Sequence, residues 1–395
     1  MQLDKNNMKN IVERLYDGTK IFPSKVRDPK ISLADMSGHN VVLYGLGECS
    51  HWFHEVAIKR FNLTPICALD KSPTSMTWFG VRALTAEAFA TESDIELTDC
   101  YVVVAVGSRI VFEDIQLYLS KIGFSKIFFL HDFYEFHNFF MQDRLEVAHR
   151  MKNNIEAFKY ALSRLSDHQS EEILCRMIQV HITTEPLDIP CSPRHEQYFP
   201  SDFNHAINYE NYVCCGAYNG EVVYQVKAAE VKVNNLVCFE PEVEIYKELA
   251  ITARREAGKV ADTIFCFQNA VSDNSNINPF ISGDGLGSRL DPLGDSLVQC
   301  TKLDDALSGF SPTFITMDIE GAELAAIKGA KKIIRENKPS LAVCVYHYPE
   351  QVADIIDQIS KLNSDYLFFI RNYTGFLTET VLYAVLPDNI HLEQA

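Results

Sequence analysis

Short hydrophobic runs alternate with amphipathic segments throughout the second half of the chain. Leu324, Ile327, Ala330 and Ile334 recur at three- and four-residue spacing, which predicts a helix between two apolar runs. Runs of this length that alternate with helices are typical of a parallel sheet in an α/β domain. The predicted strands are Tyr212 to Cys215, Leu236 to Phe239, Thr263 to Phe267, Phe314 to Met317, Leu341 to Tyr346, Tyr366 to Ile370 and Thr380 to Leu386.

The last two predicted strands are joined by a polar turn, Arg371 to Thr378, instead of a helix. They should therefore form a hairpin, with an antiparallel strand at one edge of the sheet. Five parallel strands followed by a hairpin make a mostly parallel seven-stranded sheet, as in class I methyltransferases that use S-adenosylmethionine. The pattern alone leaves open any Rossmann-type nucleotide enzyme.

A second, smaller α/β pattern precedes this one. The strand Val41 to Tyr44 runs into Gly45 and Gly47, and the next strand ends in Asp70. Glycines at such a turn let a pyrophosphate approach a helix N-terminus, while an acid one strand away takes ribose hydroxyls. The alternatives are a nucleotide or nucleotide-sugar site at Gly45, Gly47 and Asp70, and a scaffold whose glycines only close a tight corner.

These patterns divide the chain into three parts. Residues 1–133 are expected to form a Rossmann-like domain with a leading helix packed on it, and its further strands are Tyr101 to Val106 and Lys126 to Leu130. Residues 134–200 read as a helical linker and a proline-rich arm that crosses onto the next domain. His195, Tyr198 and His205 are interpreted as arm contacts and not as ligands. Residues 201–395 form the larger domain.

Composition narrows the function classes. No apolar run approaches the roughly 20 residues of a membrane span, and the first residues lack a secretion signal. The 11 cysteines are scattered without a CxxC pair, which indicates buried thiols in a reducing cytoplasm and neither disulfides nor a zinc site. The net charge of −17 comes without a basic stripe, so neither nucleic acid nor a membrane is an expected partner. The sequence leaves open a homodimer.

Polar residues gather where the predicted parallel strands end. A turn with two glycines follows Cys215, Glu240 follows the next strand, and Asp318, Glu320, Glu323 and His347 follow two adjacent strands. Open α/β sheets bind ligands at this edge. We expect these side chains to converge there.

Six motifs in order, FEPE, NAVSD, SRL with TKLDDAL, FITMDIEGAELAAIKGA, KPSLAVCVYHYPE and RNYTGFLTETVLYAV, resemble the FkbM family of methyltransferases over roughly residues 198–386. The resemblance implies methyl transfer from S-adenosylmethionine to a hydroxyl of a sugar, polyketide or similar small metabolite. It implies a methionine-side loop, a ribose clamp, adenine neighbours and two acids that face the methyl group. These are, respectively, Gly216, Ala217, Tyr218 and Gly220; Glu240; Asn269, Ala270 and Val271; and Asp318 and Glu320. Cys214 stands where the family usually has an acid, which predicts weak cofactor binding.

An alcohol must give up its proton during methyl transfer, and two arrangements would serve. His347 is the expected base because it titrates nearest neutrality, with Asp318 or Glu320 as its orienting acid. Alternatively, Asp318, Glu320 and a neighbour hold a divalent cation, for which Mg²⁺ is suited; the sequence does not favour this reading, and no metal ligand is assigned. Glu320 and Glu323 would also stabilise a helix N-terminus without any catalytic role.

Further side chains are expected near the acceptor. The segment Gly283 to Ser288 is interpreted as a mobile cover or a solvated loop, and Arg289 as a contact for an anionic substrate or an acid of the sheet edge. Tyr346, Tyr348 and Tyr373 would wall the cavity or belong to the core. Two other function classes remain: a non-catalytic sugar-nucleotide-binding or scaffold protein, and a nicotinamide-dependent oxidoreductase, which lacks an evident catalytic set.

Overall fold

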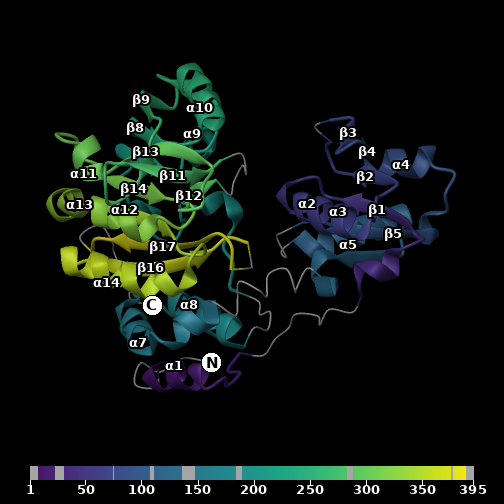
Figure 1. Cartoon of the computed structure of the whole chain (residues 1–395), viewed down its shortest axis with the longest axis horizontal. Helices are drawn as coiled ribbons and strands as arrows, with labels where there is room; N and C mark the ends of the chain where they lie inside the picture. Colours follow the sequence, from purple (N-terminus) through teal and green to yellow (C-terminus); the bar gives the residue numbers. More distant parts are fainter. Residues whose placement is uncertain are drawn as a thin grey trace.

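The computed structural model describes residues 8–22, 31–73, 75–106, 111–135, 147–183, 189–282, 288–374 and 377–387, and it contains two α/β bodies (Figure 1). Within these ranges, none of the helices combines the length and the apolar character that crossing a membrane requires.

The smaller body is a six-stranded sheet in the order β3-β4-β2-β1-β5-β6. Its four predicted strands are present, and apolar layers pack on both faces of the sheet. The sequence pattern missed β3 and β4 because they are short and one side of each is exposed. The strands are β1 (Asn40–Tyr44), β2 (Cys67–Leu69), β3 (Thr77–Trp78), β4 (Val81–Leu84), β5 (Cys100–Val104) and β6 (Lys126–Phe129), with helices α2 (Glu48–Trp52), η2 (Phe53–Ile58), α3 (Lys59–Phe61), α4 (Ala86–Glu92) and α5 (Phe112–Ile122).

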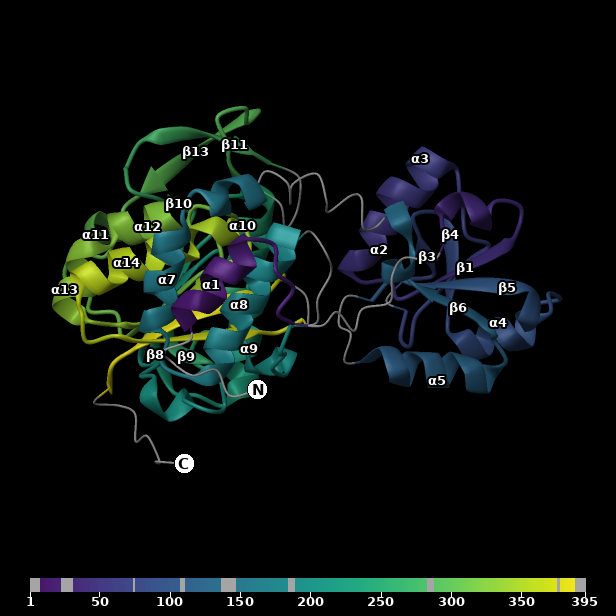
Figure 2. The same ribbon diagram turned by 90° about the horizontal axis from the view of Figure 1, so that it is seen from below.

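The leading helix packs elsewhere than expected. Helix α1 (Met8–Tyr16) lies against α7 (Ile155–Arg164) and α8 (His168–Thr183), as Figure 2 shows. The Tyr16 hydroxyl donates a hydrogen bond to the Met151 carbonyl at 2.8 Å, and Gln179 Oε1 accepts from the amides of Ile21 and Phe22. The apolar face of α1 is therefore buried on the helices that cover the larger sheet, and the expected packing on the first sheet was wrong.

The larger sheet has seven strands in the order β16-β17-β15-β14-β7-β8-β9. All seven were predicted, and apolar layers cover both faces. The terminal hairpin is present, but its antiparallel strand β17 lies between β15 and β16 and not at the edge. The strands are β7 (Asn211–Cys215), β8 (Val233–Phe239), β9 (Ala261–Phe267), β14 (Phe314–Met317), β15 (Ser340–Cys344), β16 (Leu367–Asn372) and β17 (Thr380–Val385).

The helices between these strands follow the predicted alternation, with one break. Helix α12 (Glu323–Gly329) ends at Gly329 and α13 (Lys331–Asn337) begins after Ala330, where one continuous helix was expected. A Cβ atom on Gly329 would lie 2.1 Å from the Ser272 carbonyl oxygen, so only glycine allows this approach. The other helices are α9 (Glu221–Ala229), α10 (Val243–Glu256), α11 (Leu303–Ala306) and α14 (Val352–Leu362).

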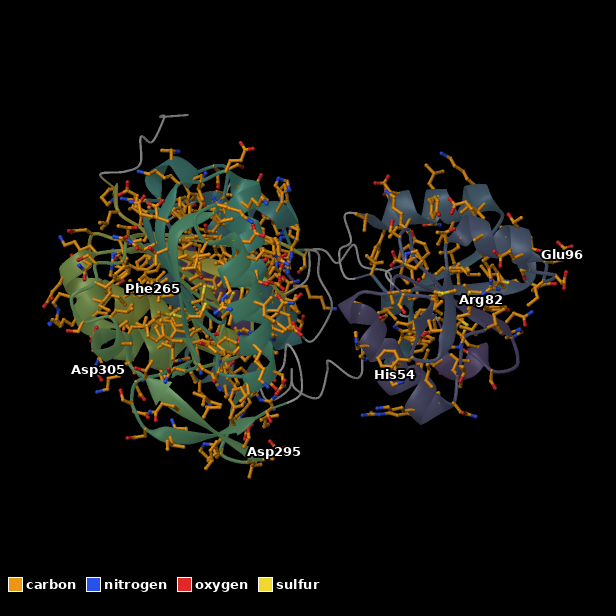
Figure 3. All side chains as sticks on the ribbon, turned by 90° about the horizontal axis from the view of Figure 1, so that it is seen from above. His54, Arg82, Glu96, Phe265, Asp295 and Asp305 are labelled. Carbon is orange, nitrogen blue, oxygen red and sulfur yellow. The ribbon has the colours of Figure 1, made fainter. Side chains whose placement is uncertain are left out.

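A small four-stranded sheet between β9 and β14 was not predicted. It has the order β10-β13-β11-β12, and Figure 3 shows Asp295 at its outer end. Its side chains alternate weakly in polarity, and Leu297 and Ile277 are exposed, so no buried stripe marked the strands. Most of the predicted cover, Gly283 to Gly287, is outside the residues that the structure describes. The strands are β10 (Ala270–Val271), β11 (Ile277–Ile281), β12 (Arg289–Leu290) and β13 (Ser296–Thr301).

The arm after α8 crosses onto the larger sheet, as predicted. Ser192 donates its amide to the Asn372 carbonyl, and the buried guanidinium of Arg371 contacts Asp167 and Asp202. These contacts fix the arm beside the hairpin of β16 and β17, close to the carboxyl ends of the parallel strands.

Candidate functional site

A cavity of about 460 Å³ opens at the carboxyl edge of the larger sheet. This volume is in the range of small-molecule sites. The structure brings nine of the eleven predicted site residues to its wall: Gly216, Ala217, Tyr218, Glu240, Asn269, Ala270, Val271, Asp318 and Glu320. Gly220 and His347 do not line it.

The turn after β7 is shaped by close backbone contact. Gly216 has φ +84°, and a Cβ atom there would lie 1.8 Å from the carbonyl oxygen of Asp318. Asp318 in turn donates its amide to the Cys215 carbonyl at 3.0 Å. The glycine therefore lets the ends of β7 and β14 touch, and it leaves open space above the turn.

Gly220 serves a different purpose. It is the first residue before α9, with φ +95°, and a Cβ atom would lie 2.9 Å from Thr252 Cγ2 on α10. This glycine allows the N-terminus of α9, which follows the turn after β7, to pack closely on α10.

Glu240 ties two loops together below the cavity. Its Oε2 accepts the Tyr218 amide at 3.0 Å, and its Oε1 accepts the Glu242 amide at 2.8 Å. Burial raises the pKa of this carboxyl to about 7, although the two amide hydrogen bonds oppose the shift. Each carboxylate oxygen has a second lone pair, so Glu240 can still accept hydrogen bonds from a ligand.

Cys214 is a fully buried thiol on the cavity wall. Burial raises its pKa to about 12, so it is neutral near pH 7. It therefore supplies neither the charge nor the acceptor strength of the acid that the family resemblance implies at this position.

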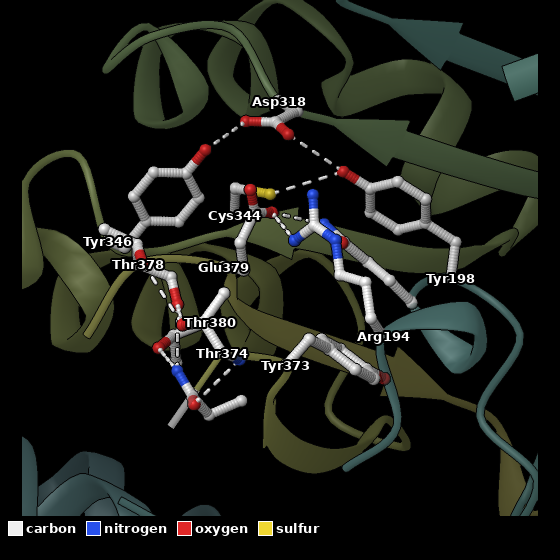
Figure 4. A network of polar contacts seen from close by, with 12 residues as sticks. Arg194, Tyr198, Asp318, Cys344, Tyr346, Tyr373, Thr374, Thr378, Glu379 and Thr380 are labelled. Carbon is white, nitrogen blue, oxygen red and sulfur yellow. Dashed lines mark hydrogen bonds and ion pairs between the residues drawn. The ribbon is translucent and has the colours of Figure 1, made fainter. Parts of the chain in front are cut away.

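Asp318 is held between two tyrosines (Figure 4). Its Oδ2 accepts the Tyr198 hydroxyl at 3.0 Å and its Oδ1 accepts the Tyr346 hydroxyl at 3.2 Å. Tyr198 lies on the arm with φ +69°, which is an uncommon conformation for a bulky residue. The interpretation of Tyr198 as an arm contact missed this position, because no local pattern reports a contact 120 residues away.

Behind Asp318, His347 lies among three carboxylates. Its Nδ1 is 2.9 Å from Glu323 Oε1, and its Nε2 is 3.2 Å from Glu320 Oε2 and 3.6 Å from Asp318 Oδ1. Burial alone would lower the pKa of His347, but Glu320 and Glu323 outweigh it and raise the pKa to about 11. In this arrangement the imidazole carries a proton at pH 7, so it cannot act as a base until that proton leaves.

The cavity rim contains charged side chains that the sequence did not single out. Arg194 from the arm pairs with Glu379 at 2.9 Å, and Gln197 donates to the same carboxylate at 2.7 Å. Burial raises the pKa of Glu379. The missed signal was the polar run in the segment that was interpreted from the sequence as an arm without catalytic or binding residues.

The remaining aromatic and basic candidates divide between wall and core. Tyr346 and Arg289 line the cavity, and Arg289 lies 3.6 Å from Asp291. Tyr373 is buried, with its hydroxyl 2.6 Å from that of Tyr383, and Tyr348 lies outside the cavity wall.

The predicted nucleotide turn of the smaller body is stabilised from within. Asp70 Oδ2 accepts the Leu46 amide and Oδ1 accepts the Ser72 amide, both at 3.0 Å. Gly45 has φ +93°, and a Cβ atom there would lie 2.9 Å from the Ala105 carbonyl oxygen. These contacts give Asp70 and Gly45 a structural reason to be present, and nucleotide binding here stays a prediction.

The comparisons with known proteins agree with the larger body. Residues 215–370 match the family model described as methyltransferase FkbM domain. The chain is also similar to the crystal structure of methyltransferase FkbM from Methylobacillus flagellatus KT, with 21% identity, a TM-score of 0.57, and coverage of 96% of this chain and 100% of that chain. This likeness shows the fold. None of the curated proteins matches the chain. The predicted FkbM methyltransferase domain and the predicted fold class are confirmed.

Proposed function

Since this chain carries a methyltransferase FkbM domain, we propose that it transfers a methyl group from S-adenosylmethionine to a hydroxyl oxygen of a small metabolite such as a sugar or polyketide. One observation carries the proposal: the glycine turn at Gly216, the acid Glu240 and the acid Asp318 line one cavity at the sheet edge. Parallel α/β sheets bind nucleosides at this place.

The residues present fit the cofactor. Gly216, whose Cβ atom would collide with backbone, keeps the turn open to the methionine part. The two free lone pairs of Glu240 suit the ribose hydroxyls, and the segment from Asn269 to Val271 suits the adenine edge. When bound, S-adenosylmethionine supplies an electrophilic methyl carbon on a sulfonium.

The chain's own residues then position the acceptor. A hydroxyl that enters between Tyr198 and Tyr346 can donate a hydrogen bond to Asp318, in place of one of the tyrosines. Alignment of the acceptor oxygen and exclusion of water supply much of the rate in such a displacement. The rim formed by Arg194, Gln197 and Glu379 suits a polar, hydroxylated acceptor.

Calorimetry with S-adenosylhomocysteine tests the cofactor assignment. We expect the full chain to bind one equivalent, and Glu240→Gln to weaken binding by about 10- to 100-fold, because a hydrogen bond to a charged group contributes about 1.5–3 kcal/mol. The matched control is Glu244→Gln, an exposed acid at the start of α10. Absence of binding by the unaltered chain, or equal affinity of both variants, would overturn the assignment.

Incubation with labelled S-adenosylmethionine and a panel of sugars and polyketide alcohols tests the reaction. Label that enters as an alkali-stable ether supports O-methylation, and label that enters nitrogen or carbon refutes it.

Cys214 supports a second candidate function. Without the acid usual at this position, the domain would be a non-catalytic binding or scaffold unit, accompanied by a sugar-nucleotide site at Gly45, Gly47 and Asp70. Binding of a sugar nucleotide without any binding of S-adenosylhomocysteine is the result expected for this alternative.

A further inference from the structure

We propose that Asp318, Glu320 and His347 form a binding site for one divalent first-row metal ion. One ligand atom from each side chain lies within 4.8 Å of the other two. His347 Nε2 is 3.2 Å from Glu320 Oε2 and 3.6 Å from Asp318 Oδ1. Ligands about 2.0–2.2 Å from a common ion are separated by roughly 3.0–3.6 Å, so these two separations need little adjustment.

The imidazole of His347 gives an independent reason for a ligand. Its side chain is 9% exposed, and its buried Nε2 has no hydrogen-bond partner among the described residues. This nitrogen lies within 3.6 Å of a carboxylate oxygen of both Asp318 and Glu320. A buried polar nitrogen of this kind requires either a proton shared with the acids or an ion.

A supporting carboxylate fixes the imidazole. Glu323 Oε1 lies 2.9 Å from His347 Nδ1 and also accepts the amides of Ile319 and Gly321 at 3.1 and 3.3 Å. Because Nδ1 faces an acid, its proton stays there, and Nε2 is the atom that would coordinate the ion after the ion displaces the proton on Nε2. Carboxylate–histidine–metal arrangements have this order of contacts.

The backbone also directs an acid toward the site. Glu320 has φ +53°, a conformation that costs a non-glycine residue energy and that persists at functional sites. Gly321 follows with φ +97°, and a Cβ atom there would lie 2.1 Å from the Tyr348 ring. The turn after β14 thus packs closely on the Tyr348 ring while Glu320 keeps this uncommon conformation.

Two carboxylates and one imidazole suit Mn²⁺, Fe²⁺ or Zn²⁺ better than an all-oxygen site would. Asp318 and Glu320 line the cavity, whereas His347 lies behind them, so open coordination positions would face the cavity. The role of the ion rests on the proposed function: a coordinated acceptor hydroxyl would lose its proton to solvent more readily. The binding site itself does not depend on that role.

Manganese binding tests the site directly. The full chain, freed of metal with a chelator, is titrated with MnCl₂ and followed by calorimetry and by the electron paramagnetic resonance signal of free Mn²⁺. We expect one equivalent to bind. Asp318→Asn and Glu320→Gln should weaken binding at least tenfold, and Glu323→Gln, which acts through His347, by about 10- to 100-fold. Glu244→Gln, an exposed acid outside both the cluster and the cavity, should bind like the unaltered chain.

Thermal melting of each metal-free variant shows whether it is folded. If one of the two ligand variants, Asp318→Asn or Glu320→Gln, does not fold, the other still tests the site. Failure of the folded unaltered chain to bind Mn²⁺ at millimolar concentration, or unchanged binding by a folded Glu320→Gln, would overturn the proposal. Mn²⁺ binding without S-adenosylhomocysteine binding would support the metal site and refute the proposed function. S-adenosylhomocysteine binding without Mn²⁺ binding would refute the metal site and leave the proposed function supported.

Discussion

The buried carboxyl of Glu240 should make the stability of the larger body depend on pH. Its pKa rises from 4.5 to about 7 on folding because burial disfavours the charged form. A raised carboxyl pKa means that the folded chain binds a proton more tightly than the unfolded chain does. The associated stability is therefore fully present below pH 4.5 and is lost as the pH rises through about 7.

The size of the effect follows from the shift. A difference of about 2.5 pKa units, 7 minus 4.5, corresponds to about 3 kcal/mol at about 1.4 kcal/mol per unit. Most of it, about 2–3 kcal/mol, should be lost between pH 5 and pH 8. For a domain of about 200 residues this equals roughly 5–10 °C in melting temperature.

Differential scanning calorimetry of the ligand-free chain and of Glu240→Gln at pH 5 and pH 8 measures this pH-dependent loss of stability. Glutamine keeps the size of the side chain and removes the titration. We expect the melting temperature of the variant, relative to that of the unaltered chain, to rise by this amount between the two pH values. Glu244→Gln should show no such change, since that side chain is exposed. A difference between Glu240→Gln and the unaltered chain that is constant with pH would refute the reasoning.

Three further substitutions test other parts of the structure. Gly216→Ala should abolish S-adenosylhomocysteine binding in calorimetry and lower the melting temperature, because the new methyl group would meet the Asp318 carbonyl; a normal affinity would contradict the turn geometry. Arg371→Met should destabilise the larger body by about 1–3 kcal/mol in urea denaturation, because it removes the buried partner of two partly exposed aspartates; a loss below about 0.5 kcal/mol would show that solvent replaces the pair. Asp70→Ala should speed hydrogen exchange of the Leu46 amide, and unchanged exchange would mean that their hydrogen bond does not hold the turn.

The strand pattern of the larger sheet could be read from the sequence because its central strands are buried on both faces. Phe314–Met317 and Ser340–Cys344 are fully buried, and buried parallel strands appear as continuous apolar runs. The small sheet between β9 and β14 lacked this signal, since alternate residues of β11 face solvent. The position of β17 between β15 and β16 could not be predicted either, because a hairpin pattern shows that two strands pair with each other but not which of them pairs with the rest of the sheet.

Local motifs were enough to predict the part of the candidate site that lies at the strand ends. The part that the arm contributes depends on long-range contacts and was not predicted. Gly216, Glu240 and Asp318 each follow a strand directly, so the parallel topology was enough to bring them together. Tyr198 reaches Asp318 from the arm through a backbone conformation that no side-chain pattern encodes.

The same distinction decides how His347 should be interpreted. Its type alone favours a base that titrates near neutrality, but Glu320 and Glu323 surround it and keep a proton on the ring when no ion is present. A positively charged imidazole and a metal ion would have the same electrostatic effect here, because each compensates the negative charge of the carboxylates that the turn after β14 brings together. On this geometry, the partner that Asp318 and Glu320 share is a cation, either the protonated ring of His347 or the proposed metal ion.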